Sequence, residues 1–185
     1  MHQRALRYRR VRDAYNYVYG RLLLQEGLKA LKLSQNIDQI QFEDSGKPFL
    51  DSVYFNISHS ADLVVCAVST KGSIGIDIEK EAEVELENFV SWFTLTEWKT
   101  IMESTLPRRQ FYRYWTRKES IIKALGLKLS DLNQIDFDIE QPRFEKNGQG
   151  WFLNELSLDD DYTGAICSEF KLEPPIHLEY FDFKG

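Results

Sequence analysis

Residues 73–80, SIGIDIEK, alternate between isoleucine and small, acidic or basic side chains, and this alternation predicts a β-strand. Because successive side chains of a strand point to opposite faces, the three isoleucines are expected to face a core. Asp77 and Glu79 then project together from the other face, about 7 Å apart along the chain. Two carboxylates at this spacing either share a divalent cation, for which hard oxygen ligands favour Mg²⁺, or form an acidic solvent face. The pattern alone leaves both interpretations open.

Three helices are predicted around this strand. Apolar residues at helical spacing indicate the first, over about 8–32. A T-x-x-E capping box begins the second, over 94–102, and the third, over 107–125, starts at a proline and stops before a glycine.

The remaining apolar segments read as strands that pair largely antiparallel. They are VYFNIS, LVVCAVS and SIGIDIE within residues 53–79, and IDFDI, GWFLNELSL, YTGAICSEF and IHLEYFDF after residue 134. The order of helix, strands, helices and strands predicts an α+β fold, with helices packed against largely antiparallel sheets. Two strand-helix groups of similar size also fit a pseudo-duplicated arrangement.

Charge is distributed unevenly along the 185 residues. Residues 1–32 hold eight basic and two acidic side chains, a charge of +6 (8 − 2), so the remainder carries −12 (−6 − 6). A basic leading helix on an acidic protein indicates a local anion site or a solvated helix face, and argues against a general nucleic-acid surface. The apolar runs are too short to cross a bilayer. The basic start leads into no apolar signal core, and Cys66 and Cys167 stand apart, so a reduced cytoplasmic protein is expected.

Several polar groups could meet an anion. FNISHS, residues 55–60, could close a turn or hold an anion, because Asn and Ser are ordinary turn formers. His59 could donate to an anion, end a strand or act as a general base, whereas no Ser-Asp arrangement nearby supports a nucleophilic triad. Lys47 of the GKP turn could be solvated or meet a phosphate. Glu119 and Lys123, one helical turn apart, could form a surface ion pair, or supply a third carboxylate and a cation for phosphates.

Taken in order, GKPFL, FNISHS, GIDIEK and WTRKESIIKALG resemble the motifs of the 4′-phosphopantetheinyl transferases, in the larger, surfactin-synthetase-type class. The resemblance extends from about Arg4 to Leu129. It implies an α+β fold with a pseudo-twofold axis and a ligand between two halves, which we expect at residues 1–72 and 73–185. It also implies a Mg²⁺-dependent enzyme, with Mn²⁺ as an alternative metal. Such an enzyme moves the phosphopantetheine arm of coenzyme A to a serine of an apo acyl or peptidyl carrier protein and releases 3′,5′-ADP. A monomer without nucleic-acid or membrane partners is expected by the same analogy.

The resemblance assigns catalytic and metal-binding roles residue by residue. Asp77, Glu79 and Glu119 match the family's metal carboxylates, and Asp77 thereby also belongs to the coenzyme A site. Lys123 matches the lysine that meets the pyrophosphate and stabilises the leaving group. Glu119 is in addition the candidate general base.

Further residues match the family's nucleotide-binding groups. His59 matches a histidine near the 3′-phosphate of coenzyme A, and Ser58 flanks it. Lys47 and Pro48 match the loop that borders the nucleotide.

The basic helix departs from the family pattern at one position. Asn16 stands where an arginine is often found, although Asp13-Ala14 and Gly20 fit. Arg4 is the best-placed substitute for contacts to the 3′-phosphate, and nearby arginines at 7, 9 and 12 are expected to contribute. The sequence also begins close to this helix, without the leading strand segment common in larger members.

A carrier-facing surface and two other functions also fit the sequence. Arg108, Arg109 and Arg113, beside Phe111 and Tyr112, could form a basic rim for an acidic carrier, or simply an exposed helix start. The alternatives to transfer are a Mg²⁺-dependent nucleotide phosphohydrolase and a non-enzymatic anion-binding or nucleic-acid-binding module.

Overall fold

The computed structural model describes residues 10–173, 176 and 178–181, so Arg4, Arg7 and Arg9 lie outside the described residues. The helical elements are α2 (Val11–Ala30), α3 (Leu95–Met102) and α4 (Pro107–Leu125), with 3-10 helices η1 (Ile37–Gln39), η2 (Leu86–Trp92) and η3 (Leu129–Gln134). The strands are β1 (Gln41–Phe42), β2 (Pro48–Phe49), β3 (Tyr54–Ser60), β4 (Leu63–Ser69), β5 (Ile74–Lys80), β6 (Arg143–Lys146), β7 (Gln149–Glu155) and β8 (Tyr162–Ser168).

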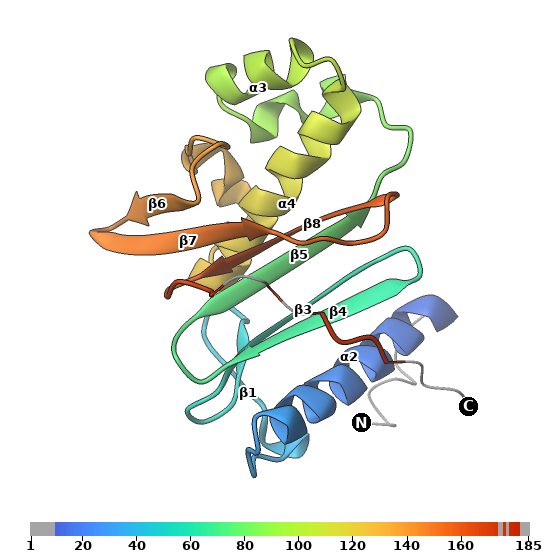
Figure 1. Ribbon diagram of the computed structural model, residues 1–185, viewed down its shortest axis with the longest axis vertical. Helices are drawn as coiled ribbons and strands as arrows, with labels where there is room; N and C mark the ends of the chain where they lie inside the picture. The colour runs from blue at the N-terminus through green and yellow to red at the C-terminus, as the bar shows by residue number, and fades with distance from the viewer. Residues whose placement is uncertain (1–9, 174–175, 177, 182–185) are drawn as a thin grey trace.

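The described strands form three antiparallel sheets, in the orders β1-β2, β3-β4 and β5-β8-β7-β6. Helix α2 packs on the β3–β4 hairpin, and helix α4 packs on β5 and β8 (Figure 1). Each half of the molecule is thus one long helix against antiparallel strands. The predicted α+β, pseudo-duplicated fold is confirmed.

The two halves meet where β3 runs beside β5 without a shared backbone ladder. Side-chain oxygens of alternate β3 residues instead accept hydrogen bonds from alternate N–H groups of β5: Asn56 from Ile76 at 2.9 Å, Ser58 from Ile78 at 3.4 Å and Ser60 from Lys80 at 3.0 Å. We call Asn56, Ser58 and Ser60 the seam. It supplies the partners that the buried edge of β5 requires.

The seam also decides the interpretation of FNISHS. Every residue of this segment pairs with β4, so the segment is a strand, and the alternative of a turn is wrong. Its polar side chains alternate with Phe55, Ile57 and His59, which face the other way because a strand has a period of two.

Strand β5 is buried on both faces. Its isoleucines join a core with Leu156 and Ile166, as the alternation predicts. On the other face, Gly75 meets α4 so closely that an added Cβ atom would lie 2.2 Å from the Ser120 carbonyl oxygen. Asp77 is only 3% exposed on that face, so the alternative of an acidic solvent face is wrong.

The helix ends agree with the sequence signals. Thr94 and Glu97 form both hydrogen bonds of the capping box at the start of α3. Helix α4 begins at Pro107 and ends before Gly126, whose φ of 68° is left-handed, the conformation that suits glycine. Helix α2 begins three residues later and ends two residues earlier than predicted.

The IDFDI segment, residues 135–139, is not the strand that its alternation predicts. Two of its carbonyl groups accept from buried side chains of α4: Lys118 Nζ donates to Ile135, and Arg117 donates to Ile139. These two carbonyl groups therefore need no partner from a neighbouring strand.

The C-terminal strand set differs from the prediction in two further places. The described residues of IHLEYFDF, 176 and 178–181, form no strand. An unpredicted strand, β6, pairs with β7 through a two-residue turn in which Asn147 has φ 54° and Gly148 has φ 77°. The Asn-Gly pair is a strong hairpin signal, so the sequence did contain the means to find β6.

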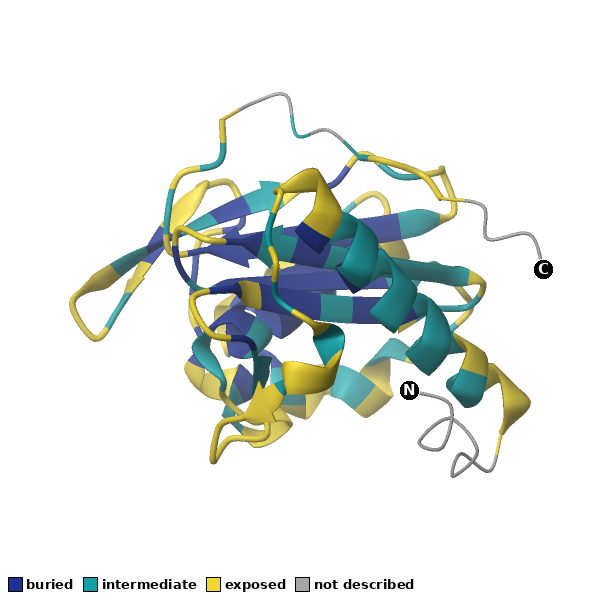
Figure 2. Cartoon of the chain, turned by 90° about the horizontal axis from the view of Figure 1, so that it is seen from below, coloured by how far each residue is buried: buried dark blue, intermediate teal, exposed yellow. Residues whose placement is uncertain are grey.

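Helix α2 is only half-buried along most of its length (Figure 2). Gly20, Leu24 and Leu28 are its buried residues, and the two leucines pack with Leu50 and Phe55. Hollows lie on both sides of α2. No described helix combines the length and apolar character needed to cross a membrane.

Candidate active site

A cleft of about 220 Å³ opens where the two halves meet, between β3, β5 and α4. We call it the carboxylate cleft; it is lined by Ile57, Ser58, His59, Asp77, Glu79, Trp115, Glu119 and Lys123. The structure thus brings together six of the residues singled out from the sequence, from three segments far apart in the chain.

Helix α4 reaches this cleft because Gly75 of β5 has no side chain, which lets the helix backbone pack directly on the strand. An added Cβ atom there would also lie 2.4 Å from the Ala124 nitrogen, so only glycine allows this approach. Glu119 and Lys123 share one face of the helix, and both line the cleft beside Asp77.

Asp77 accepts two hydrogen bonds in the cleft. Lys123 Nζ lies 2.6 Å and Ser58 Oγ 2.8 Å from its Oδ1 atom, while Oδ2 is buried without a hydrogen-bond partner among the described residues. Burial raises the pKa of Asp77, although the ammonium of Lys123 acts in the opposite direction.

The two other carboxylates are also shifted toward their protonated forms. Ser60 Oγ donates to Glu79 at 2.7 Å, yet burial raises the pKa of Glu79, and the charge of Asp77 adds to this. Burial raises the pKa of Glu119 to about 7; Lys123 opposes the shift, and Asp77 and Glu79 reinforce it.

A divalent cation fits the chemistry of this donor set. Three ionised carboxylates against the single ammonium of Lys123 leave two negative charges, and carboxylate oxygens are the ligands that Mg²⁺ prefers. In the described part of the chain, however, no three His, Cys, Asp or Glu side chains are already arranged to hold a metal ion. Asp77 turns to Lys123, and Glu79 turns to Ser60. The metal assignment therefore stays a prediction.

Lys47 and Pro48 do not line the carboxylate cleft. The ammonium of Lys47 instead lies inside the protein, where it donates to Ser73 Oγ at 2.7 Å and to the Ala124 carbonyl at 2.5 Å. Burial lowers its pKa. Lys47 thus ties the GKP turn to the end of α4, and the assignment of Lys47 and Pro48 to the nucleotide stays a prediction.

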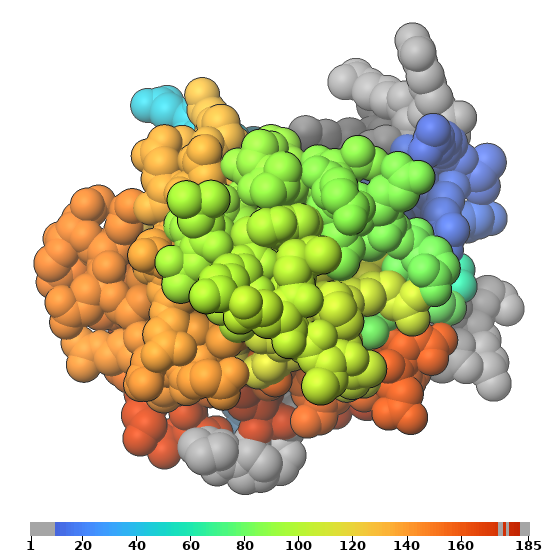
Figure 3. Space-filling model, turned by 90° about the horizontal axis from the view of Figure 1, so that it is seen from above, coloured from blue at the N-terminus to red at the C-terminus, as the bar shows by residue number. Residues whose placement is uncertain are grey.

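The arginines near the carrier rim and the helix start are engaged with acidic side chains. Arg108 pairs with Glu83, Arg109 with Glu81, Arg113 with Glu155 and Arg12 with Asp62. Phe111 and Tyr112 are buried, so the exposed part of the predicted rim consists of the arginines alone. These arginines belong to the first turns of α4, on the side of the molecule where η2 and α3 lie (Figure 3).

The sequence reasoning missed some residues that build the cleft. Ser60 and Asn56 carry the seam, and the N-x-S-x-S spacing of FNISHS already places them on one face with Ser58. Trp115 is half-buried and also lines the cleft. The glycine at position 75 is the only feature of the sequence that indicates the close packing of α4 on β5.

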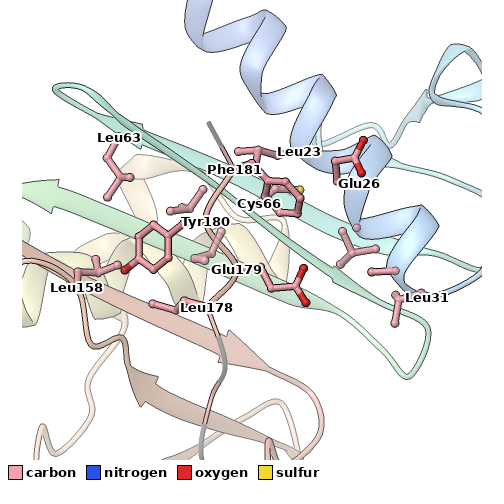
Figure 4. A pocket seen from close by; sticks show the side chains of 15 residues that line it. Leu23, Glu26, Leu31, Leu63, Cys66, Leu158, Leu178, Glu179, Tyr180 and Phe181 are labelled. Carbon is pink, nitrogen blue, oxygen red and sulfur yellow. The ribbon is translucent and has the colours of Figure 1, made fainter. Parts of the chain in front are cut away.

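A separate apolar cavity of about 280 Å³ lies between α2, β4 and residues 178–181 (Figure 4). No lysine, arginine or histidine of the described residues lines it, whereas Glu26 and Glu179 do. A diphosphate is therefore not expected there, and the carboxylate cleft is the better candidate for phosphate chemistry.

Comparison with known proteins gives two family matches that together cover most of the chain. Residues 73–167 match the model of the 4′-phosphopantetheinyl transferase superfamily, and residues 1–71 match that of the 4′-phosphopantetheinyl transferase N-terminal region.

Individual relatives agree with these matches. The chain is 37% identical to the 4′-phosphopantetheinyl transferase gsp of Aneurinibacillus migulanus, over 91% of its own length and 74% of the relative's. It is 34% identical to the L-aminoadipate-semialdehyde dehydrogenase-phosphopantetheinyl transferase of Xenopus laevis, over 90% and 62%. It is 29% identical to the 4′-phosphopantetheinyl transferase Sfp of Bacillus subtilis, over 88% and 71%. The chain thus spans about three fifths to three quarters of the length of these relatives.

Proposed function

The chain belongs to the 4′-phosphopantetheinyl transferase superfamily, and from this premise we propose that it transfers the phosphopantetheine group of coenzyme A to a serine of an apo carrier protein. The second product is 3′,5′-ADP. The family resemblance inferred from the four sequence motifs is confirmed by the matches. The matches favour a transferase over the two alternatives, a nucleotide phosphohydrolase and a non-enzymatic anion-binding module.

One observation carries the proposal. Asp77, Glu79, Glu119, Lys123 and His59 converge on a single cleft between the two halves. Phosphoryl transfer needs chiefly positioned groups and neutralised charge, and this cleft offers carboxylates, an ammonium and an imidazole within one small volume.

The reaction forms one bond and breaks one bond at phosphorus. The carrier serine oxygen attacks the phosphorus that bears the pantetheine arm, and the bond to the bridging oxygen of 3′,5′-ADP breaks. Glu119 takes the serine proton; in the metal-free cleft burial raises the pKa of its carboxyl group to about 7, which makes it a stronger base than an exposed glutamate.

Lys123 acts on the leaving group. Its ammonium, 2.6 Å from Asp77 in the present arrangement, turns to the diphosphate and stabilises the charge that develops on 3′,5′-ADP. Ser58 Oγ, 3.2 Å from Lys123 Nζ, helps to hold the lysine at the cleft.

Asp77, Glu79 and Glu119 are the residues that would hold Mg²⁺. When bound, the cation supplies charge neutralisation for the diphosphate. Because a carboxylate that holds a cation is a weaker base, Glu119 serves the two roles in competition.

The test is to incubate the protein with coenzyme A, Mg²⁺ and a panel of apo acyl and peptidyl carriers, and to weigh the carriers. We expect a mass gain of one phosphopantetheine group on at least one carrier. Asp77→Asn, which keeps the shape of a buried side chain but removes its charge, should lower the rate of transfer by at least about 100-fold.

Asp62→Asn is the matched control. The Asp62 side chain is 86% exposed and pairs with Arg12 at the surface, so transfer should stay within about twofold of the wild type. Normal turnover by Asp77→Asn in excess Mg²⁺ would remove the metal-site assignment. Nucleotide release without any carrier mass gain would overturn the transferase proposal in favour of hydrolysis.

A further inference from the structure

The end of helix α4 is held by a lysine from the other half of the molecule. Lys47 Nζ donates to the Ala124 carbonyl at 2.5 Å and to Ser73 Oγ at 2.7 Å, and Ser73 Oγ donates to the same carbonyl at 2.6 Å. We call Lys47, Ser73 and Ala124 the α4 anchor. It joins the GKP turn of the N-terminal half to the helix that carries Glu119 and Lys123.

The Ala124 carbonyl needs a partner from outside its own helix. Helix α4 ends at Leu125, and the last four carbonyl groups of a helix have no intrahelical partner. The N–H group four residues after Ala124 belongs to Lys128, and it donates to Asp131 at 2.9 Å instead. An ammonium is suited to this place, because the negative end of the helix dipole lies at the C-terminus.

The GKP turn presents Lys47 from an ordered backbone. The N–H group of Lys47 donates to Ser45 Oγ at 3.2 Å, and its carbonyl accepts from the Glu43 N–H at 2.9 Å. Gly46, with φ 85°, adopts the left-handed conformation that glycine permits. The side chain of Lys47 therefore extends to α4 from a backbone that hydrogen bonds hold on both sides.

The contacts of Lys47 favour an action on α4 over a direct contact with a phosphate. Lys47 lines neither the carboxylate cleft nor the hollow between α2 and β3. Two of the three N–H groups of its ammonium already donate inside the protein. To reach a ligand in the carboxylate cleft, the ammonium would have to leave the Ala124 carbonyl.

The anchor acts on the helical turn that carries Lys123. Lys123 directly precedes Ala124, and its ammonium lies 2.6 Å from Asp77 in the carboxylate cleft. The ends of helices fray, so the last turn of α4 depends on contacts that hold it from outside. The anchor and the close packing on Gly75 both fix Ala124. The position of Lys123 therefore depends on them.

We propose that Lys47 is a positioning residue for Lys123. Through the Ala124 carbonyl it holds the last turn of α4, and it thereby sets the rate at which the bond at phosphorus is broken. The proposal rests on the proposed function, which gives Lys123 its role on the leaving group. It deepens that function, because a displacement of about 1 Å in a catalytic group can cost about 100-fold in rate.

The first experiment compares the kinetics of Lys47→Met, Ser73→Ala and the double variant with those of the wild type. Lys47→Met keeps the aliphatic stem and removes the ammonium, so kcat should fall about 10- to 100-fold while KM for coenzyme A stays within about threefold. Ser73→Ala removes the second donor, and kcat should fall about three- to tenfold at unchanged KM. The double variant should match Lys47→Met within about twofold, because both donors serve one carbonyl.

The control for these variants is Lys29→Met. It removes the same group from an exposed lysine that pairs with Glu26, and it should change neither kcat nor KM. A double variant whose loss is the product of the two single losses would contradict an action through one carbonyl.

Hydrogen exchange separates this inference from the transferase proposal, because it needs no transfer. Lys47→Met should speed the exchange of the amide groups of residues 122–126 at least about fivefold, and Ser73→Ala should speed it less. If the wild type modifies no carrier, the proposed function fails, and exchange in these residues still decides whether Lys47 holds the end of α4. Unchanged exchange there would overturn the proposal.

Calorimetry with 3′,5′-ADP tests the competing role of Lys47 as a direct nucleotide contact. Lys47→Met should bind 3′,5′-ADP within about threefold of the wild type. Binding weakened more than about tenfold, with kcat unchanged, would overturn the proposal and assign Lys47 to the nucleotide. Circular dichroism shows that the variants are folded, and Ser73→Ala alone carries the same test of kcat, KM and exchange should Lys47→Met not fold.

Discussion

Burial in the carboxylate cleft changes what a single side chain can do. Glu119 is 9% exposed, and its pKa rises from 4.5 to about 7, so between these pH values the folded protein binds a proton that the unfolded chain releases. Stability from this source is fully present below about pH 4.5 and is lost as the pH rises through about 7.

Glu119→Gln should remove this dependence in the metal-free protein. In EDTA, we expect the variant to match the wild type near pH 4.5 and to exceed it by about 2 to 3 kcal/mol in free energy of unfolding at pH 8. Urea unfolding at four pH values checks this. Glu103→Gln, at an exposed helix end, should show no such trend; a constant difference between Glu119→Gln and the wild type would contradict the shifted pKa.

Another single residue, Lys118, stabilises the fold and takes no part in the cleft. It is 0% exposed and pairs with Glu97 at 2.8 Å while it donates to two carbonyl groups. Burial lowers the pKa of Lys118 and raises that of Glu97, so each needs the other to remain charged.

Lys118→Met should lower the free energy of unfolding by about 3 to 5 kcal/mol, because it leaves the Glu97 carboxylate buried without its partner. The double variant Lys118→Met/Glu97→Gln should recover part of this loss. Denaturant unfolding measures both; a double variant no more stable than the single one would show that the ion pair is not the cause.

At the scale of elements, the packing of α4 on β5 positions the cleft. Gly75→Ala places a Cβ atom 2.2 and 2.4 Å from two backbone atoms of α4. This clash can be relieved only if the helix or the strand moves. We expect a loss of about 2 to 3 kcal/mol in stability and a larger loss of transfer activity, because Glu119 and Lys123 move with the helix.

Gly72→Ala is the control for this prediction. A Cβ atom at Gly72 meets only the side chain of Glu169, which can rotate away, so the cost should stay below about 1 kcal/mol. Thermal unfolding and carrier mass gain are measured on both variants. Equal stability of the Gly75 and Gly72 variants would disprove the tight contact.

The sequence predicts those elements whose start, end or turn is marked by their own residues. Pro107 and Gly126 mark the ends of α4, and the Asn147-Gly148 pair marks a hairpin that can be recognised without a structure. The alternation in residues 135–139 misleads because Arg117 and Lys118, distant in sequence, bind two of the carbonyl groups in this segment. Local pattern cannot report on such tertiary partners.

The candidate site was predictable only in part, for a similar reason. Strand periodicity places Asp77 and Glu79 on one face, and helical periodicity places Glu119 and Lys123 on one face. These two faces meet because α4 packs closely on β5 at Gly75. The spacing of residues within either segment does not predict this contact. The family resemblance supplied this link.

At the scale of the whole molecule, the seam couples the two halves. Asn56 Oδ1 accepts from the Ile76 N–H at 2.9 Å, and Asn56 is 8% exposed. Removing this acceptor leaves a buried N–H without a partner, at a cost of about 1 to 3 kcal/mol.

Asn56→Ala should therefore destabilise both halves together. All four tryptophans, at positions 92, 98, 115 and 151, belong to the C-terminal half, so their fluorescence reports on unfolding across the seam from the mutation. We expect the urea midpoints by fluorescence and by far-UV circular dichroism to fall together. The exposed Asn88→Ala should change neither midpoint; a fluorescence midpoint that does not move in Asn56→Ala would mean that the halves unfold independently.

The seam has a consequence for how such a protein can change over generations. Hydrogen bonds between main chains can form with almost any sequence. The contact between these halves instead depends on the side chains of Asn56, Ser58 and Ser60. A substitution at any of these positions can therefore remove a hydrogen bond between the halves, which a side-chain change cannot do in a ladder of main-chain bonds.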